Sequence, residues 1–387
     1  MNCDFDHPPP RCGTDSLKWQ RYGDALPLWV ADMDFLSPEP VLAALRERVA
    51  HGVFGYGAPP EALTETICAR MAERYGWAVT PEQIIYLPGL VCGLNVACRA
   101  IGEAGDAVLA QTPVYPPFLS APLQQERQLL VAELDGEQRC GQLYYTFDDG
   151  ALAATITPRT RLFMLCHPHN PVGRAFDRAE LGRLADICER YDLTVCSDEI
   201  HCDLLFDNRQ HVPFASLSPE IARRCITLMA PSKTFNIAGL GASFAIIQNL
   251  ELRQRFKRAM RGIVPDVNIL ALHAALAAYR HGGDWLRELL DYLAANRHFA
   301  AGYIARHLPG TRATVPEATY LLWLDCRDAG IPGDPHRFFL DRAKVALNDG
   351  ATFGRGGDGF VRLNFGCPRA TLAEGLGRMR AALAGNT

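Results

Sequence analysis

Residues 230–240 read Ala-Pro-Ser-Lys-Thr-Phe-Asn-Ile-Ala-Gly-Leu, which places a lysine shortly after an apolar run. The run 225–230 predicts a buried strand, and Pro231 ends it just before Lys233. Lys233 is therefore expected at the carboxyl end of a strand, where open α/β sheets bind ligands. A partly desolvated lysine at such an edge loses its proton readily and attacks carbonyl groups to form an imine. Taken alone, the stretch fits a surface lysine in a turn at least as well.

Two further strand ends carry polar side chains. The apolar run 162–166 is followed by Asn170, and the run 193–197 is followed directly by Asp198. In a parallel sheet these two residues and Lys233 converge at one edge. An amine nucleophile, a carboxylate and an amide donor in one place suit pyridoxal phosphate. The amine holds its aldehyde, the carboxylate keeps its ring nitrogen protonated, and the amide binds its phenolic oxygen.

Three segments carry a resemblance to a known family: His-Asn-Pro-Val-Gly-Arg at 169–174, Ser-Asp-Glu-Ile-His at 197–201 and Ser-Lys-Thr-Phe-Asn-Ile-Ala-Gly-Leu at 232–240. They resemble fold-type I pyridoxal-phosphate enzymes of the class I/II aminotransferase superfamily, and closely the cystathionine β-lyase (MalY/PatB-type) branch. The resemblance spans nearly the whole chain, from Gly13 to Arg369. It implies an α/β fold with a mainly parallel seven-stranded sheet flanked by helices, plus a smaller α/β domain.

The apolar pattern itself predicts about seven strands, a plausible single sheet, starting near Ile84, Ala107, Gln128, Leu162, Leu193, Cys225 and Ala242. Two helix starts are predicted from capping residues, at Ser37 and at Asp177, the latter within a D-x-x-E capping box. We expect residues 51–285 to form a large cofactor-binding domain and residues 286–387 a smaller domain. Residues 1–50 are expected to form an N-terminal segment that packs with the smaller domain.

The resemblance implies which residues hold the ring of pyridoxal 5'-phosphate. Lys233, Asp198 and Asn170 take the three roles described above. His201 is counted among the cofactor ligands, and it stands where many aminotransferases have tyrosine. Tyr115 is implied to stack on the ring, although a core tyrosine in a Pro-rich turn is the structural alternative.

The phosphate group is implied to lie at the start of a helix, at the backbone N–H groups of Leu90 and Val91. A strand-to-helix turn that needs a glycine is the structural alternative for this stretch. Ser232 and Tyr56 complete this set. Tyr56 is assigned from the neighbouring subunit, so the resemblance implies a homodimer with shared active sites; a simple turn with a packed aromatic is the alternative. Gly241 stands where many aminotransferases carry a phosphate-binding arginine, which fits the lyase branch better.

The substrate is implied to bind through Arg362, which lies in a β-patterned segment. The planar fork of an arginine can bind a carboxylate through two parallel hydrogen bonds. The resemblance implies that Arg362 binds the substrate's α-carboxylate in this way. Ala31 and Asn170 complete the substrate-binding set. A salt bridge at the rim of the site is the structural alternative for Arg362.

The reaction that we expect is a β-elimination. Lys233, once the substrate amine has replaced it, removes the α-proton, Asp198 stabilises the developing carbanion and the β-thiolate leaves. Tyr115 is counted with them as catalytic. Cystathionine or another L-cysteine S-conjugate would then yield a thiol, pyruvate and ammonia. Two alternatives stay open: an aminotransferase, which shares the early steps, and a non-catalytic binding or regulatory protein that retains the fold.

The composition fits this interpretation. The chain has 387 residues, 48% of them hydrophobic, which suffices for one large and one smaller domain. Its net charge of -4 gives no electrostatic footprint for nucleic acid or an anionic membrane, so we expect neither as a partner. The 13 cysteines include no C-x-x-C pair, which favours a reducing cytoplasm over a disulfide framework. The N-terminus carries acids where a signal peptide carries basic residues.

Two other kinds of site are disfavoured. Residues 166–169, Cys-His-Pro-His, precede Cys196 and further histidines, but their spacing matches no standard zinc pattern, so no metal is expected. Residues 239–241, Gly-Leu-Gly, could start a dinucleotide fingerprint. The third glycine of that fingerprint is missing, however, and a strand follows where a helix is required.

Overall fold

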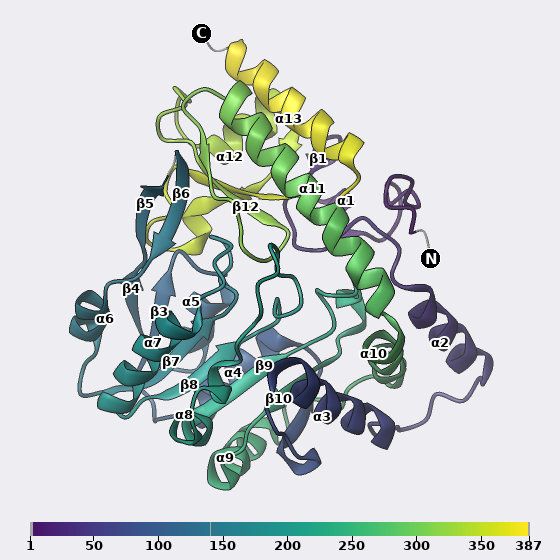
Figure 1. Cartoon of the computed structure of the whole chain (residues 1–387), viewed down its shortest axis with the longest axis vertical. Coiled ribbons are helices and arrows are strands. Elements are labelled where there is room, and N and C mark those ends of the chain that lie inside the picture. Colours follow the sequence, from purple (N-terminus) through teal and green to yellow (C-terminus); the bar gives the residue numbers. More distant parts are fainter. Residues whose placement is uncertain (1–2, 140, 386–387) are drawn as a thin grey trace.

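The structure of the chain is a computed structural model that describes residues 3–139 and 141–385 (Figure 1). Its helices are α1 (Leu17–Gln20), α2 (Glu39–Ala50), α3 (Glu61–Tyr75), α4 (Leu90–Ala100), α5 (Pro117–Gln124), α6 (Asp149–Thr155), α7 (Arg178–Arg190), α8 (Pro219–Arg224), α9 (Leu250–Met260), α10 (Ile269–His281), α11 (Gly283–His307), α12 (Pro335–Phe338) and α13 (Arg369–Ala384).

Its strands are β1 (Leu26–Pro27), β2 (Ile84–Leu87), β3 (Ala107–Thr112), β4 (Gln128–Glu133), β5 (Asp135–Arg139), β6 (Gln142–Thr146), β7 (Thr160–Cys166), β8 (Thr194–Asp198), β9 (Cys225–Met229), β10 (Ser243–Ile246), β11 (Arg312–Ala313), β12 (Leu321–Asp325), β13 (Val345–Ala346), β14 (Asn348–Asp349) and β15 (Phe360–Asn364).

The main sheet has seven strands in the order β2-β10-β9-β8-β7-β3-β4. The five strands from β9 to β4 pair in parallel, whereas β10 runs antiparallel to both of its neighbours. This confirms the predicted mainly parallel, seven-stranded sheet. Parallel pairing brings the carboxyl ends of β7, β8 and β9 to the same edge, as the sequence predicted.

Both faces of this sheet are covered, because each buried strand has apolar side chains on both sides. Along β7, Leu162 and Met164 pack in one cluster with α4, α5 and α9. The alternate residues Phe163 and Leu165 pack in another cluster with α3, α7 and α10. Successive side chains of a strand point to opposite faces, so a continuous apolar run demands helices on both sides.

A second, smaller sheet has the strand order β11-β12-β15-β14. It shares its apolar cluster with α11 and α13, which lie side by side in Figure 1, and with N-terminal residues that include Leu28 and Met33. The N-terminal segment therefore packs against the carboxyl-terminal part of the chain. The domain division at residues 50 and 285 stays a prediction.

The two predicted helix caps have different outcomes. The capping box of α7 is confirmed, since Asp177 accepts from the Glu180 N–H and Glu180 accepts from the Asp177 N–H. The N-cap prediction for Ser37 is wrong: α2 begins at Glu39 after Pro38, without a side-chain cap. The Ser37 hydroxyl instead donates to the Asn236 carbonyl at 3.0 Å, so it is engaged away from the backbone of the helix.

Within residues 3–139 and 141–385, no helix is both long and apolar enough to cross a membrane. The described histidine, cysteine and acidic side chains form no group that could hold a metal ion.

Candidate active site

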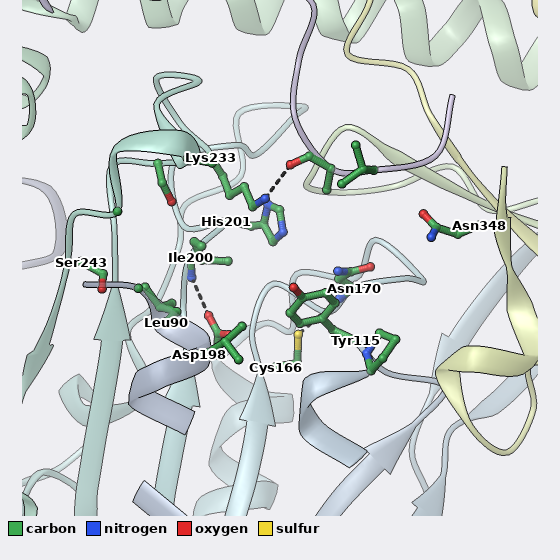
Figure 2. Close-up of a pocket in the computed structure, with 18 of the residues that line it drawn as sticks. Leu90, Tyr115, Cys166, Asn170, Asp198, Ile200, His201, Lys233, Ser243 and Asn348 are labelled. Carbon is green, nitrogen blue, oxygen red and sulfur yellow. Dashed lines mark hydrogen bonds between the residues drawn. The ribbon is translucent and has the colours of Figure 1, made fainter. Parts of the chain in front are cut away.

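A cavity of about 400 Å³ lies at the carboxyl ends of β7, β8 and β9, between the main sheet and the carboxyl-terminal part of the chain (Figure 2). Ten of the residues singled out in the sequence line it: Ala31, Leu90, Val91, Tyr115, Asn170, Asp198, His201, Ser232, Lys233 and Arg362. They come from segments that are up to 331 residues apart. The sheet topology and the N-terminal segment together bring them to one place.

Tyr56 is the predicted site residue that this chain does not bring to the cavity. Its side chain is fully exposed on the loop before α3. It lies beside residues 265–270, where it lines a separate surface pocket.

Lys233 lies four residues beyond the end of β9. Its Nζ atom donates to the Ala31 carbonyl at 2.5 Å, a bond that Figure 2 draws as a dashed line. Burial lowers the pKa of Lys233 to about 8, and this outweighs the opposing attraction of the Asp32 and Asp198 carboxylates. At pH 7 about a tenth of such an amine is unprotonated and nucleophilic, far more than for an ordinary lysine.

Asp198 is the last residue of β8 and is 5% exposed. Its carboxylate accepts one hydrogen bond, from the Ile200 N–H at 3.1 Å, and makes no ion pair within the described chain. Burial raises the pKa of Asp198 to about 7, and the neighbouring Glu199 adds to this rise. A buried carboxylate with so little compensation is suited to a cationic or proton-donating ligand group.

Arg362 lies in β15 and is 3% exposed. It donates to the Asn170 side-chain oxygen at 2.9 Å, to the Trp29 carbonyl at 3.2 Å and to the Asn348 side-chain oxygen at 2.6 Å. All three acceptors are uncharged, and the Nε atom is buried without a partner. Burial without a counter-ion lowers the pKa of Arg362 to about 10. Buried charges in proteins are normally paired, so this guanidinium is suited to bind an anion from outside the chain.

The amino-terminal end of α4 faces the same cavity through Gly89, Leu90 and Val91. Its N-cap, Gly89, offers no side chain to the first backbone N–H groups of the helix. Such free N–H groups, together with the helix dipole, form an anion site. Ser232, the residue before Lys233, also lines the cavity.

Gly241 is glycine for a structural reason. Its φ of 74° lies in the left-handed region, and a Cβ atom there would lie 2.7 Å from the Pro88 carbonyl oxygen. No arginine can occupy this position unless the backbone moves, which accounts for the departure from the common aminotransferase pattern.

His201 and Tyr115 complete the predicted set. His201 is buried, and burial lowers its pKa to about 3, with Lys233 and Arg362 adding to the effect. The imidazole is therefore neutral near neutral pH, and its Nδ1 atom has no hydrogen-bond partner among the described residues. Tyr115 donates its backbone N–H to the Asn170 carbonyl at 3.1 Å, and Figure 2 shows its ring beside Asn170, to the right of Asp198.

These unmatched groups fit pyridoxal 5'-phosphate. The cofactor has an aldehyde for Lys233, a basic ring nitrogen for Asp198, a phenolic oxygen for the amide of Asn170 and a phosphate for the start of α4. The cavity thus offers a chemically suitable group for each polar group of the cofactor.

Residues 24–379 match the family described as aminotransferase class I and II. The chain belongs to this family. Pyridoxal 5'-phosphate is its cofactor, and the fold is that of the fold-type I enzymes.

Three relatives match this family member along its whole length. Cystathionine beta-lyase PatB of Bacillus subtilis (strain 168) is 42% identical over 391 residues, which cover 98% of the chain and 99% of PatB. The crystal structure of OvoB is 48% identical with a TM-score of 0.93, and the match covers 98% of the chain and 99% of OvoB. The crystal structure of cystalysin from Treponema denticola, which contains a pyridoxal 5'-phosphate cofactor, is 33% identical with a TM-score of 0.94 and full coverage of both chains.

The sequence analysis placed Ala31 at the site of this aminotransferase-family chain, but it missed how the surrounding residues 29–34, here called the strap, are held over the cavity. The Ala31 carbonyl accepts from Lys233 and also from the Tyr320 hydroxyl at 2.9 Å. Asn364 donates to the Val30 and Asp32 carbonyls at 2.7 Å each. The strap is therefore fastened by side chains from both the lysine loop and the smaller sheet.

It also missed Asn348, which lines the cavity and binds Arg362. Asn348 lies in the two-residue strand β14, which is too short to give a periodic pattern. Asn348 could have been found only from its place opposite Arg362 in the sheet, and that place is known only once the pairing of β14 with β15 is known.

Proposed function

We propose that the chain is a pyridoxal-phosphate-dependent carbon–sulfur β-lyase that cleaves cystathionine or related L-cysteine S-conjugates into a thiol, pyruvate and ammonia. The observation that carries the proposal is the grouping, in one cavity, of an amine with a lowered pKa, a buried carboxylate and an unpaired buried guanidinium. The full-length similarity to a cystathionine beta-lyase supports the choice of reaction within the family.

The cofactor would be held by the residues that border the cavity. Lys233 would bind its aldehyde, Asp198 its ring nitrogen and Asn170 its phenolic oxygen, with Tyr115 against the ring and His201 nearby. Its phosphate would lie at the backbone of Leu90 and Val91, with Ser232 and the partner's loop contributing further donors. When bound, the cofactor supplies an electron sink that stabilises negative charge at the substrate's α-carbon.

The chain's own residues would bind, orient and deprotonate the substrate. Arg362 binds the α-carboxylate with its planar fork and so fixes the direction of the α-hydrogen. The Nζ atom of Lys233 accepts the α-proton, which its pKa of about 8 permits near neutral pH. The strap 29–34 covers the amine and limits the access of water. The β-thiolate then leaves and takes up a proton to give the thiol, and water hydrolyses the released three-carbon imine to pyruvate and ammonia.

The product distribution tests this proposal. Purified holoenzyme is incubated with cystathionine in the absence of any keto acid, and pyruvate, ammonia and thiol are measured. Equal amounts of pyruvate and ammonia are expected. A strict requirement for a keto acid would instead identify an aminotransferase, which shares the same binding residues.

A homodimer with shared sites is part of the proposal. Tyr56 is fully exposed and lines a pocket other than the cavity of its own chain, and position 241 has glycine where an arginine could bind the phosphate. A partner's tyrosine hydroxyl would supply a donor that the phosphate needs, and two-fold dimers are the commonest assembly. A cytoplasmic location is also proposed, and the twelve described cysteines, all without disulfides, support it.

Mixed dimers test the sharing. Co-expression of Tyr56→Phe and Lys233→Ala chains gives hybrids in which one site has both defects and the other has neither. Activity above that of either parent variant is expected. If each chain used its own Tyr56, every site would carry one defect and no activity would be regained.

A further inference from the structure

The three hydrogen-bond acceptors around the buried Arg362 guanidinium carry no charge. Its three acceptors, from Asn170, Trp29 and Asn348, are two amide side chains and one backbone carbonyl. The described chain places no carboxylate within ion-pair distance of this guanidinium. The fork is therefore oriented by hydrogen bonds while its positive charge stays uncompensated.

Asn348 makes the shortest of these bonds, at 2.6 Å. It lies directly opposite Arg362 in the antiparallel pair of β14 and β15, so the strand register fixes its position. Its side chain is half-buried and lines the cavity, and Figure 2 shows it on the side away from Lys233. With its oxygen bound to Arg362, the amide directs its N–H groups elsewhere, and none of the described residues accepts from them.

An aspartate at this position would have nearly the same shape and would also accept from Arg362. It would differ in charge, because a carboxylate against a buried guanidinium forms a strong, charge-assisted pair. The guanidinium would then be neutralised from within the chain. A substrate carboxylate would have to compete with that pair and approach a like charge.

We propose that Asn348 is a positioning residue for the substrate's α-carboxylate: its neutral amide orients Arg362 while leaving the positive charge of the guanidinium for the substrate. This rests on the proposed role of Arg362. It makes the absence of charge at position 348, and not only the presence of a hydrogen-bond acceptor, a determinant of substrate binding.

Two substitutions separate orientation from charge. Asn348→Ala removes the acceptor and leaves the charge of Arg362 free, whereas Asn348→Asp keeps an acceptor of the same shape and adds a negative charge. For each holoenzyme, kcat and KM are measured with cystathionine. The inhibition constant is measured with L-alanine, which carries the α-carboxylate but no β leaving group.

Asn348→Ala should raise KM and the inhibition constant by about 3- to 10-fold, since one hydrogen bond that orients Arg362 is lost. Asn348→Asp should raise both by about 30-fold or more, since the internal pair must be broken. The change in kcat should be smaller than the change in KM. The melting temperature of Asn348→Asp should equal or exceed that of the wild type, because a buried charge gains a partner.

Asn249→Asp is the matched control. Asn249 caps α9 by accepting from the Leu252 N–H, which aspartate does equally well, and it lies outside the cavity. The same charge change there should leave KM unchanged. If Asn348→Asp binds L-alanine as tightly as Asn348→Ala or more tightly, the role of charge at position 348 is wrong. If Arg362→Lys leaves KM unchanged, Arg362 does not bind the substrate's α-carboxylate. This variant therefore separates a failure of the Arg362 assignment from a failure of the role proposed for Asn348.

Discussion

Replacement of Asp198 by asparagine should make the stability of the cofactor-free protein less dependent on pH. The pKa of this carboxyl rises from an ordinary value of 3.8 to about 7 on folding, because it is buried with one backbone N–H as its partner. The folded chain thus binds this proton more tightly than the unfolded chain does. The stability that Asp198 contributes is complete below about pH 4 and is lost as the pH rises through about 7.

The size of the effect follows from that shift. Each pH unit between the two pKa values changes the free energy of unfolding by about 1.4 kcal/mol, so ionised Asp198 costs the cofactor-free protein up to about 4 kcal/mol. Asparagine keeps the shape and the acceptor for the Ile200 N–H but carries no charge. Between about pH 5.5 and pH 8, the stability of the variant relative to the wild type should increase by about 2 kcal/mol.

Urea denaturation of both cofactor-free proteins at the two pH values measures this difference, and the other titrating groups cancel between them. In the enzyme with bound cofactor, the charged carboxylate of Asp198 should be stabilising instead of destabilising, because a protonated ring nitrogen would favour it. The variant should then bind the cofactor more weakly and lose activity by orders of magnitude. An equal stability difference at both pH values would refute the buried, uncompensated environment described for Asp198.

Borohydride treatment of the yellow holoenzyme should fix a pyridoxyl group on Lys233. Lys18, which is buried against Asp34, should stay unlabelled, and labelling at any lysine other than Lys233 would contradict the assignment. Arg362→Lys should lower kcat/KM by about 100-fold or more, mostly through KM, because an ammonium lacks the two-pronged fork. The same change at the half-buried Arg378, which pairs with Glu374 outside the cavity, should leave KM unchanged. Gly241→Ala should lower the free energy of unfolding by about 1–3 kcal/mol, because its φ is positive and its Cβ would meet Pro88. The matched change Gly239→Ala, where a Cβ meets nothing, should have little effect, and equal losses in thermal denaturation would argue against the strain at position 241.

The sequence by itself determined the main sheet and the part of the site that follows its strands. Short apolar runs that end in Asn170, Asp198 and Lys233 are local signals, and the parallel topology that they imply places their ends at one edge. The same holds for the capping box of α7, which involves residues three apart. The segments around these residues were also long enough to carry the family resemblance.

Only the tertiary structure decided the surroundings of those residues. The strap 29–34 meets the lysine loop through a bond that spans 202 residues, and Arg362 meets Trp29 across 333 residues. Asn348 reaches Arg362 by strand pairing that no local pattern indicates. The lowered pKa of Lys233 and the raised pKa of Asp198 follow from burial, which is a property of the packed chain. Local sequence therefore selected the chemical groups, whereas long-range packing set their charge states and their partners, because desolvation arises only when distant segments close over the same cavity.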